Sequence, residues 1–378
     1  MSSRPIAVLL AGTAFLVGGS LPASAIEPEA AAKALAAALV KGSNVEATFE
    51  SAELNGSDIV IGGFVVTRTA KDDRLSFEEI VIEAPIEGEK GVFQSPQITF
   101  TGGTLAGDVN GTIAAGTMTR VTVLDAAKQT SSAPAAAILY DSAEATELKF
   151  VRSGQPGEVT IDRIYVEAGN LVDDIPQDNS GSVEGIVLTS DLFPDTGFKP
   201  DTFGYDKLTV DLSWDVSRDI AASKLTINDF SVSIAEGGDL SLSGVIGDLP
   251  DPRALNDAGA ESDIAKTKVH ELSVRYDDHS LAGRVLDFLA QRQGLSRADY
   301  AKQITDALPF LLIAINNPAF QEQVAGAVGG FLQNPQSLNI EIAPETPVSG
   351  DDLMALAKSE PGTIPDRLKA SVTANTPE

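Results

Sequence analysis

The sequence has 378 residues, of which 43% are hydrophobic, and its formal net charge at pH 7 is −27. This hydrophobic content excludes global disorder, because a chain of this length and composition can bury a large core. The negative charge excludes nucleic acid as a favoured partner and disfavours anionic lipid headgroups at the general surface. The chain has no cysteine, which excludes disulfides and lipoprotein modification.

Residues 1–25 have the three parts of a secretory signal peptide. A basic start at Arg4 precedes an apolar stretch at 6–17, and Ala23 and Ala25 supply the small residues of a cleavage site. The apolar part is too short to span a membrane, and no later stretch approaches 18 uninterrupted apolar residues. We therefore expect a Sec-type signal peptide, cleavage after Ala25, export to the periplasm, and no transmembrane segment in the mature chain.

Residues 26–44 predict one alanine-rich helix. Pro28 is tolerated in a first helical turn, and Gly42 follows as a stop signal. Leu35 and Leu39 belong to a single apolar stripe. We expect this helix to lie across an end of a sheet.

Residues 45–265 predict an antiparallel β region. The clearest alternation is at 208–216, where every second residue is apolar and Thr, Asp or Ser stands between. One apolar face and one wet face favour an antiparallel sheet over a βαβ sheet. Turn signals separate the expected strands, among them the glycine pair at 102–103 and the polar stretch 178–181.

Two irregular segments rich in proline and glycine interrupt the β pattern. Residues 193–204 predict a connection between two halves of the β region, and residues 248–263 predict a second linker. After this linker the pattern changes, so that residues 266–378 predict an α+β region.

One pattern recurs within the expected strands. In residues 225–232, Leu-Thr-Ile-Asn-Asp-Phe-Ser-Val, the alternation is interrupted by two adjacent polar residues and resumes with the opposite parity. One extra residue at Asn228-Asp229, a β-bulge, keeps both apolar pairs on one face; a tight two-residue turn is the alternative. Similar stretches are 75–82, 143–150, 159–166 and 267–274.

Repeated bulges predict a large curved antiparallel sheet with an apolar concave face. The alternative is that any large antiparallel protein with a one-sided core shows this pattern. The expected fold class is therefore mostly β, or α+β, with helices packed at the ends of the sheet.

Several helix signals follow in the C-terminal region. Ser280 is expected to cap a helix at 281–292, and Ser296 with Asp299 predicts a second helix that ends before Pro309. The remaining expected elements are a helix at 318–332, a strand at 338–342, a helix at 351–358 capped by Ser349, and a final strand at 368–373.

The sequence lacks the common catalytic motifs. It contains no G-x-S-x-G nucleophile elbow, no G-x-G dinucleotide fingerprint and no P-loop. His270-Glu271 begins like a zinc-protease motif, but Val274 replaces the second histidine, so we expect a partly buried structural histidine. Carboxylate pairs carry no information in so acidic a chain. We expect no catalysis, no cofactor and no metal site.

The high acidic content has two interpretations. The plainer one is solubility, and the more specific one is low-affinity calcium binding. The acidic stretch 173–184 misses the EF-hand spacing, because the acids that Gly181 would require are replaced by Pro176 and Val187.

The segment Arg-Tyr-Asp-Asp-His-Ser-Leu at 275–281, followed by a helix and Gly294, carries a resemblance. With the strands before it, it resembles Gram-negative envelope proteins of the YdgA and AsmA-like kind, which have long curved sheets. The resemblance covers residues 205–300 and transfers no functional residue. It implies a periplasmic, non-catalytic protein connected with envelope maintenance and lipid handling, although those proteins are often membrane-tethered.

The region 308–332 is unusually apolar. An amphipathic helix needs only one apolar stripe, so a nearly continuous run predicts burial on several sides or a cover over a ligand groove. We expect the protein to bind a lipid, another apolar ligand or an apolar segment of an envelope protein. A structural scaffold and an acidic calcium-dependent envelope protein are the alternatives. The candidate ligand-binding residues are Phe310, Leu311, Ile313 and Phe331.

Overall fold

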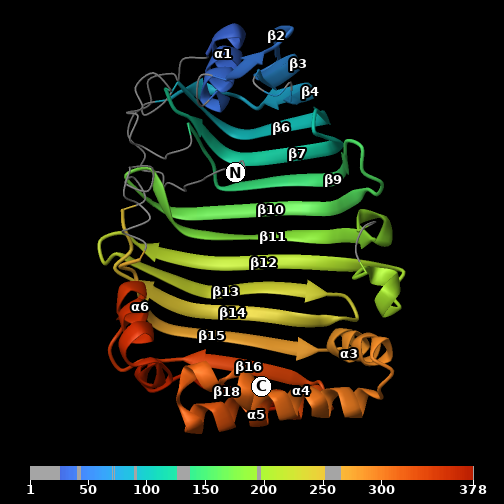
Figure 1. Ribbon diagram of the computed structural model, residues 1–378. Helices are drawn as coiled ribbons and strands as arrows, with labels where there is room; N and C mark the ends of the chain where they lie inside the picture. Colours follow the sequence, from blue (N-terminus) through green and yellow to red (C-terminus); the bar gives the residue numbers. More distant parts are fainter. Residues whose placement is uncertain are drawn as a thin grey trace. The chain divides into compact units, whose positions relative to one another are not determined.

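Figure 1 shows the computed structural model, which describes residues 26–40, 44–69, 71, 73–88, 92–125, 137–193, 197–251 and 265–377. The expected signal peptide and most of the expected linker at 248–263 lie outside the described residues. The described residues form 18 strands, and the pairings within each unit are antiparallel. The fold is therefore mostly β, as the alternation predicts.

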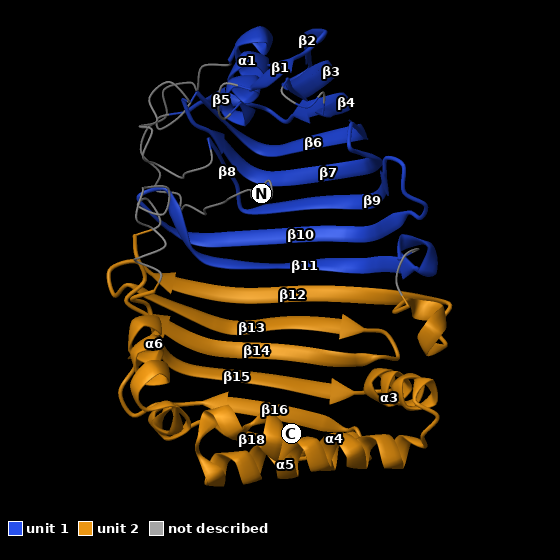
Figure 2. Cartoon of the chain, viewed as in Figure 1, with its two compact units in different colours: residues 1–194 blue, residues 195–378 orange. Residues whose placement is uncertain are grey.

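The chain divides into two compact units, residues 1–194 and 195–378 (Figure 2). The division falls within the connection expected at 193–204. Each unit has its own run of strands and its own helices, and each is described separately.

The described part of unit 1 is an antiparallel meander with one α-helix and one short 3-10 helix. Its strands β1 and β2 both pair with β3, and β4, β6, β7, β9, β10 and β11 follow in sequence order, while the short β5 and β8 add to β6 and β7. The elements are α1 (Pro28–Leu39), β1 (Val45–Thr48), β2 (Ser51–Asn55), β3 (Asp58–Arg68), β4 (Asp73–Ile82), β5 (Ile86–Glu87), β6 (Phe93–Ala106), β7 (Val109–Val123), β8 (Ile138–Leu139), β9 (Ser142–Arg152), β10 (Val159–Val172), β11 (Ile175–Thr189) and η1 (Ser190–Leu192).

The core of unit 1 lies between α1 and one face of its sheet (Figure 1). Ala31, Ala32 and Leu35 of α1 are almost fully buried against apolar side chains of β3, β4, β6 and β7. The two alanine side chains are small and allow the helix backbone to approach the sheet closely. Phe77 and Phe100 pack within this core with ring centroids 4.7 Å apart.

The parity switch is present in unit 1, but it does not shift the register. In β4, Phe77 and Ile80 both reach the core, although they are separated by an odd number of positions. Opposite them in β3, Gly63 has a left-handed φ of +61° and makes the same switch, so the pairing stays continuous on both sides of it. Gly102 in β6, with φ +62°, and Glu147 in β9, with φ +52°, repeat this device.

Unit 2 is a second antiparallel run with helices at one end. Strands β12 to β16 pair in sequence order, β18 pairs with β16, and the short β17 pairs with β15. Its elements are η2 (Pro200–Phe203), β12 (Lys207–Asp219), β13 (Lys224–Ile234), β14 (Gly238–Gly247), β15 (Lys268–Asp278), α3 (Leu281–Arg292), α4 (Arg297–Leu311), η4 (Ile313–Ile315), α5 (Pro318–Gln333), β16 (Ser337–Ile342), β17 (Val348–Ser349), α6 (Gly350–Ser359), η5 (Pro361–Thr363), α7 (Ile364–Leu368) and β18 (Ser371–Ala374).

In unit 2 the parity switches are true bulges. The register of β13 shifts between Ile227 and Phe230 against both neighbouring strands, which confirms the bulge expected at Asn228-Asp229 and excludes the two-residue turn. A second shift opposite Val245 and Ile246 leaves His270 as the extra residue of β15. His270 is exposed, so the expectation of a partly buried histidine is wrong. A bulge turns its extra residue out of the regular alternation.

The helix caps follow the sequence signals at two of three places. Ser296 accepts a hydrogen bond from the Asp299 backbone N–H at 3.1 Å, and Ser349 with Asp352 forms a complete capping box. At α3 the expected cap is wrong, because Asp278 rather than Ser280 accepts the hydrogen bond from the Ala282 N–H.

Three expected breaks are wrong. Residues 102–103 lie inside β6, and the chain turns at Gly107-Asp108 instead. Residues 178–181 lie inside β11, and α4 continues through Pro309 to Leu311. Glycine and polar residues are tolerated within a long strand when it is paired with a strand on each side. The hydrogen bonds of the sheet then outweigh the local turn preference.

Among the described residues, no helix is both long and apolar enough to cross a membrane.

Candidate functional site

One face of the unit 2 sheet carries apolar side chains that the described residues leave partly accessible to solvent. Two cross-strand rows run through β12, β13 and β14, because Cα partners in a sheet share a face. The first row is Leu212, Val232 and Leu240, and the second is Trp214, Phe230 and Leu242. We call these six residues the open face.

The open face is accessible to solvent. None of its six side chains is classed as buried, and Phe230 and Leu240 are 38% and 39% exposed. Scattered exposed apolar residues are ordinary on a protein surface, but a contiguous patch on adjacent strands marks an interaction site.

The rows continue into β15, where the helices begin to cover them. Leu240 lies opposite Tyr276, and Leu242 lies opposite Val274. Phe331 of α5 packs edge-on against the Tyr276 ring, with centroids 6.0 Å apart. The α5 helix also contacts β16 and β18, which it accompanies in Figure 1. Phe331 of α5 therefore borders the open face on its β15 side.

Tyr276 also has a polar contact at this border of the open face. Its hydroxyl donates a hydrogen bond to the Asp278 carboxylate at 2.7 Å. Burial, with the neighbouring Asp278 as the next contribution, raises the pKa of the Tyr276 hydroxyl above its ordinary value. Tyr276 is thus neutral at physiological pH and adds no charge beside the open face.

The opposite face of the same strands is polar. Ser213 and Ser231, which are cross-strand partners, share a hydrogen bond of 2.7 Å, and Asp229 accepts a second one from Ser213 at 3.3 Å. The alternation of β12 therefore separates a wet face from an apolar face, as residues 208–216 predict.

The four candidate residues from the sequence do not form one site. Phe310, Leu311 and Ile313 lie together where α4 meets η4, and they are 76%, 70% and 70% exposed. Phe331 is instead 8% exposed and contacts Tyr276. Of the two alternatives for this apolar run, burial is therefore wrong for the first three residues, which form an exposed apolar tip.

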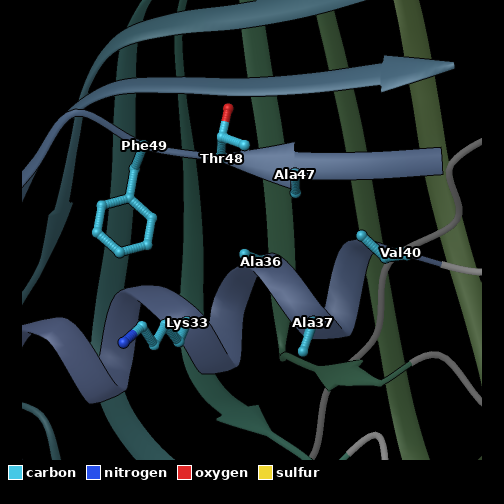
Figure 3. A pocket seen from close by; sticks show the side chains of 7 residues that line it. All are labelled: Lys33, Ala36, Ala37, Val40, Ala47, Thr48 and Phe49. Carbon is cyan, nitrogen blue, oxygen red and sulfur yellow. The ribbon is translucent and has the colours of Figure 1, made fainter. Parts of the chain in front are cut away.

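A shallow groove lies in unit 1 between α1 and β1. Figure 3 shows Ala36 of the helix pointing toward the strand and Ala47 pointing back toward the helix, while Val40, which follows the helix, also lines the groove. The groove has a volume of about 570 Å³. Its lining residues are Lys33, Ala36, Ala37, Val40, Ala47, Thr48 and Phe49.

The charged groups show ordinary surface pairing. Arg163 lies between Glu144 and Glu184, at 3.0 and 3.2 Å, and the hydrogen bond that it donates to Glu144 is the main cause that raises the pKa of its guanidinium. Within the described part of the chain, no group of three acidic or histidine side chains could hold a metal ion.

Sequence reasoning did not select Phe230 and Leu240 as binding residues. Their alternation is visible in the sequence, but nothing local to these strands indicates whether a helix covers them. That information depends on where α5 ends against β15.

A family model described only as "Uncharacterized protein" matches residues 231–375, from β13 to β18. The match covers less than half of the chain. No curated protein matches the sequence.

Proposed function

We propose that this is an exported, non-catalytic periplasmic protein that binds a lipid acyl chain or a similar elongated apolar molecule on the open face. The observation that carries the proposal is the exposure of Phe230 and Leu240 within two continuous apolar rows. An apolar ligand on these rows would remove both its own surface and theirs from water, which is favourable in proportion to the area buried.

The chemistry of the open face favours the hydrocarbon part of a lipid. Its six side chains include no charged group, and the polar residues of the same strands lie on the other face. A charged headgroup placed on this face would lose water without gaining a partner. The headgroup is therefore expected to remain in solvent.

The single tryptophan of the chain gives a direct test, because Trp214 lies on the open face. The mature protein is titrated with a brominated fatty acid, and quenching of tryptophan fluorescence is measured. Saturable quenching is expected. Leu240→Asp should weaken binding at least about tenfold, because it places a carboxylate against the acyl chain.

Ser241→Asp is the matched control. Ser241 neighbours Leu240 in β14 but belongs to the polar face, so the same new charge should leave quenching unchanged. Quenching that does not saturate, or equal effects of both variants, would contradict the proposal and favour the scaffold alternative. Native mass spectrometry of protein purified from its host should show retained lipid.

The location is tested separately by N-terminal sequencing of the native protein. We expect the chain to begin at Ile26. A retained Met1 would contradict export.

A further inference from the structure

The outer edge of β1 presents backbone groups that no described strand uses. Asn44 accepts a hydrogen bond from the Thr69 N–H at 3.0 Å, and the pairing of β1 with β3 continues from there without a shift. Bonded and non-bonded pairs alternate in an antiparallel ladder, so the N–H and C=O groups of Val45 and Ala47 point away from β3. Within the described residues, β1 and β2 pair with β3 alone.

The groove beside α1 borders this edge (Figure 3). The side chains of Ala36, Val40 and Ala47 that line it are small or branched apolar groups. A strand added beside β1 would therefore find space for an apolar side chain on the α1 side of the sheet.

The other side of the same edge is acidic. Ala47 and Ala52 pack toward the unit 1 core, so their neighbours Glu46 and Glu53 project from the opposite face, because successive side chains alternate. Glu46 and Glu53 are exposed, as is Glu50 between the two strands. β1 and β2 contain no lysine or arginine.

We propose that the edge formed by β1 and β2 binds an extended, basic segment of another protein by strand addition. The backbone of that segment bonds to Val45 and Ala47. Its alternate side chains are apolar on the α1 side, where the groove accepts them, and lysine or arginine on the side of Glu46 and Glu53.

The charge on this edge argues against a second copy of the chain as the occupant. Edge-to-edge pairing of two copies would bring the glutamates of both into neighbouring positions, and like charges across a strand pair are destabilising. The formal net charge of −27 adds a general repulsion. A basic segment converts the same charges into attraction and a faster association.

Fluorescence polarisation with a labelled peptide tests the proposal. The peptide alternates valine and lysine and is long enough to span β1. We expect saturable binding that weakens as salt is added. Two comparison peptides separate strand addition from charge attraction: a scrambled sequence of the same composition, and the same sequence with alternate backbone nitrogens methylated. Both should bind about tenfold more weakly.

Two protein variants test the location. Ala47→Pro removes an N–H that points away from β3, so it should weaken binding about tenfold without removing a bond of the ladder. The double variant Glu46→Lys and Glu53→Lys should weaken binding by a similar factor and provides a second test if the proline variant does not fold. Leu240→Asp in unit 2 is the control that should have no effect.

Equal affinity for all three peptides, an undiminished affinity of the glutamate double variant, or no saturable binding would overturn the proposal. Dimerisation through this edge, detected by sedimentation and lost in Ala47→Pro, would identify a second copy as the occupant instead. Retained acyl-chain binding with no peptide binding would leave the open face proposal intact.

Discussion

The unit 1 core and the open face of unit 2 are built from the same alternation of apolar and polar residues, but the first is buried and the second is partly exposed. In β3, Ile59, Ile61 and Phe64 are completely buried beneath α1. On β13 and β14, Phe230 and Leu240 remain more than one third exposed. Alternation determines which side of a strand is apolar. The helix that buries this side is a separate element, which the sequence of the strand does not specify.

The two regions also switch parity by different means. In unit 1, neighbouring strands carry matched switches in one row, with a left-handed residue in every second strand at Gly63, Gly102, Glu147 and Gly185. In unit 2, an extra residue on one strand shifts the register. Both devices return the apolar residues to one face, and both explain why the sequence pattern is the same.

A matched pair of phenylalanine truncations should give the largest contrast. Phe64→Ala empties a site that is 0% exposed, and we expect it to reduce the free energy of unfolding by about 3–5 kcal/mol. Phe230→Ala removes a side chain that is already partly in water, and should cost about 1 kcal/mol. Chemical denaturation of each variant measures the difference. The same Phe230→Ala protein should lose quenching by the brominated fatty acid, and equal costs for the two variants would contradict the distinction between a covered and an open face.

Alanine substitution should reduce stability by different amounts at the left-handed glycine of unit 1 and at the bulge of unit 2. Gly102→Ala forces a side chain into φ +62° and should cost about 1–2 kcal/mol, with Glu78 moving aside to make room. Asn228→Ala removes exposed hydrogen bonds to Asp215 and Ser217, both 3.1 Å, and should cost about 0.5 kcal/mol. Denaturant midpoints of the two variants make the comparison. A larger loss at Asn228 would show that the bulge depends on its side chain rather than on the extra residue.

The smallest expected effect concerns α1, the helix that covers the unit 1 core. Glu29 forms a 2.7 Å ion pair with Lys33 one turn along α1, and this hydrogen bond lowers the pKa of the Glu29 carboxyl below its ordinary value of 4.5. Because the folded pKa is lowered, the stabilisation is present above pH 4.5 and is lost as the pH falls through the folded pKa.

Melting temperatures of the native protein and Glu29→Gln should therefore differ slightly at neutral pH and converge in acid. The pair is fully exposed, so salt should shrink the difference. A difference that grows as the pH falls would contradict this assignment.

Much of the fold could be predicted from particular residues. The alternation at 208–216 gives β12 and its two faces, and the adjacent polar residues at 228–229 give the bulge of β13. The Ser349 cap signal predicts the start of α6. Each of these depends on interactions within a few residues, or on the period of a strand, and both are visible in the sequence.

The candidate site could be predicted only in part. The apolar run after Leu308 indicates an unusual surface, but its exposure at Phe310 and the burial of Phe331 depend on how α4 and α5 dock. The edge of β1 was not predicted at all, because an unpaired edge is a property of the whole set of strand pairings.

The sequence by itself therefore determined the antiparallel class, the apolar side of each strand and the places where parity switches, because these follow from backbone periodicity and local sterics. Among the described residues, only the tertiary structure decided that α1 buries one apolar face, that α5 covers the unit 2 sheet no further than β15, and that β1 lies at an edge. Those outcomes depend on contacts between segments far apart in the chain, and burial is a property of such contacts rather than of any one strand.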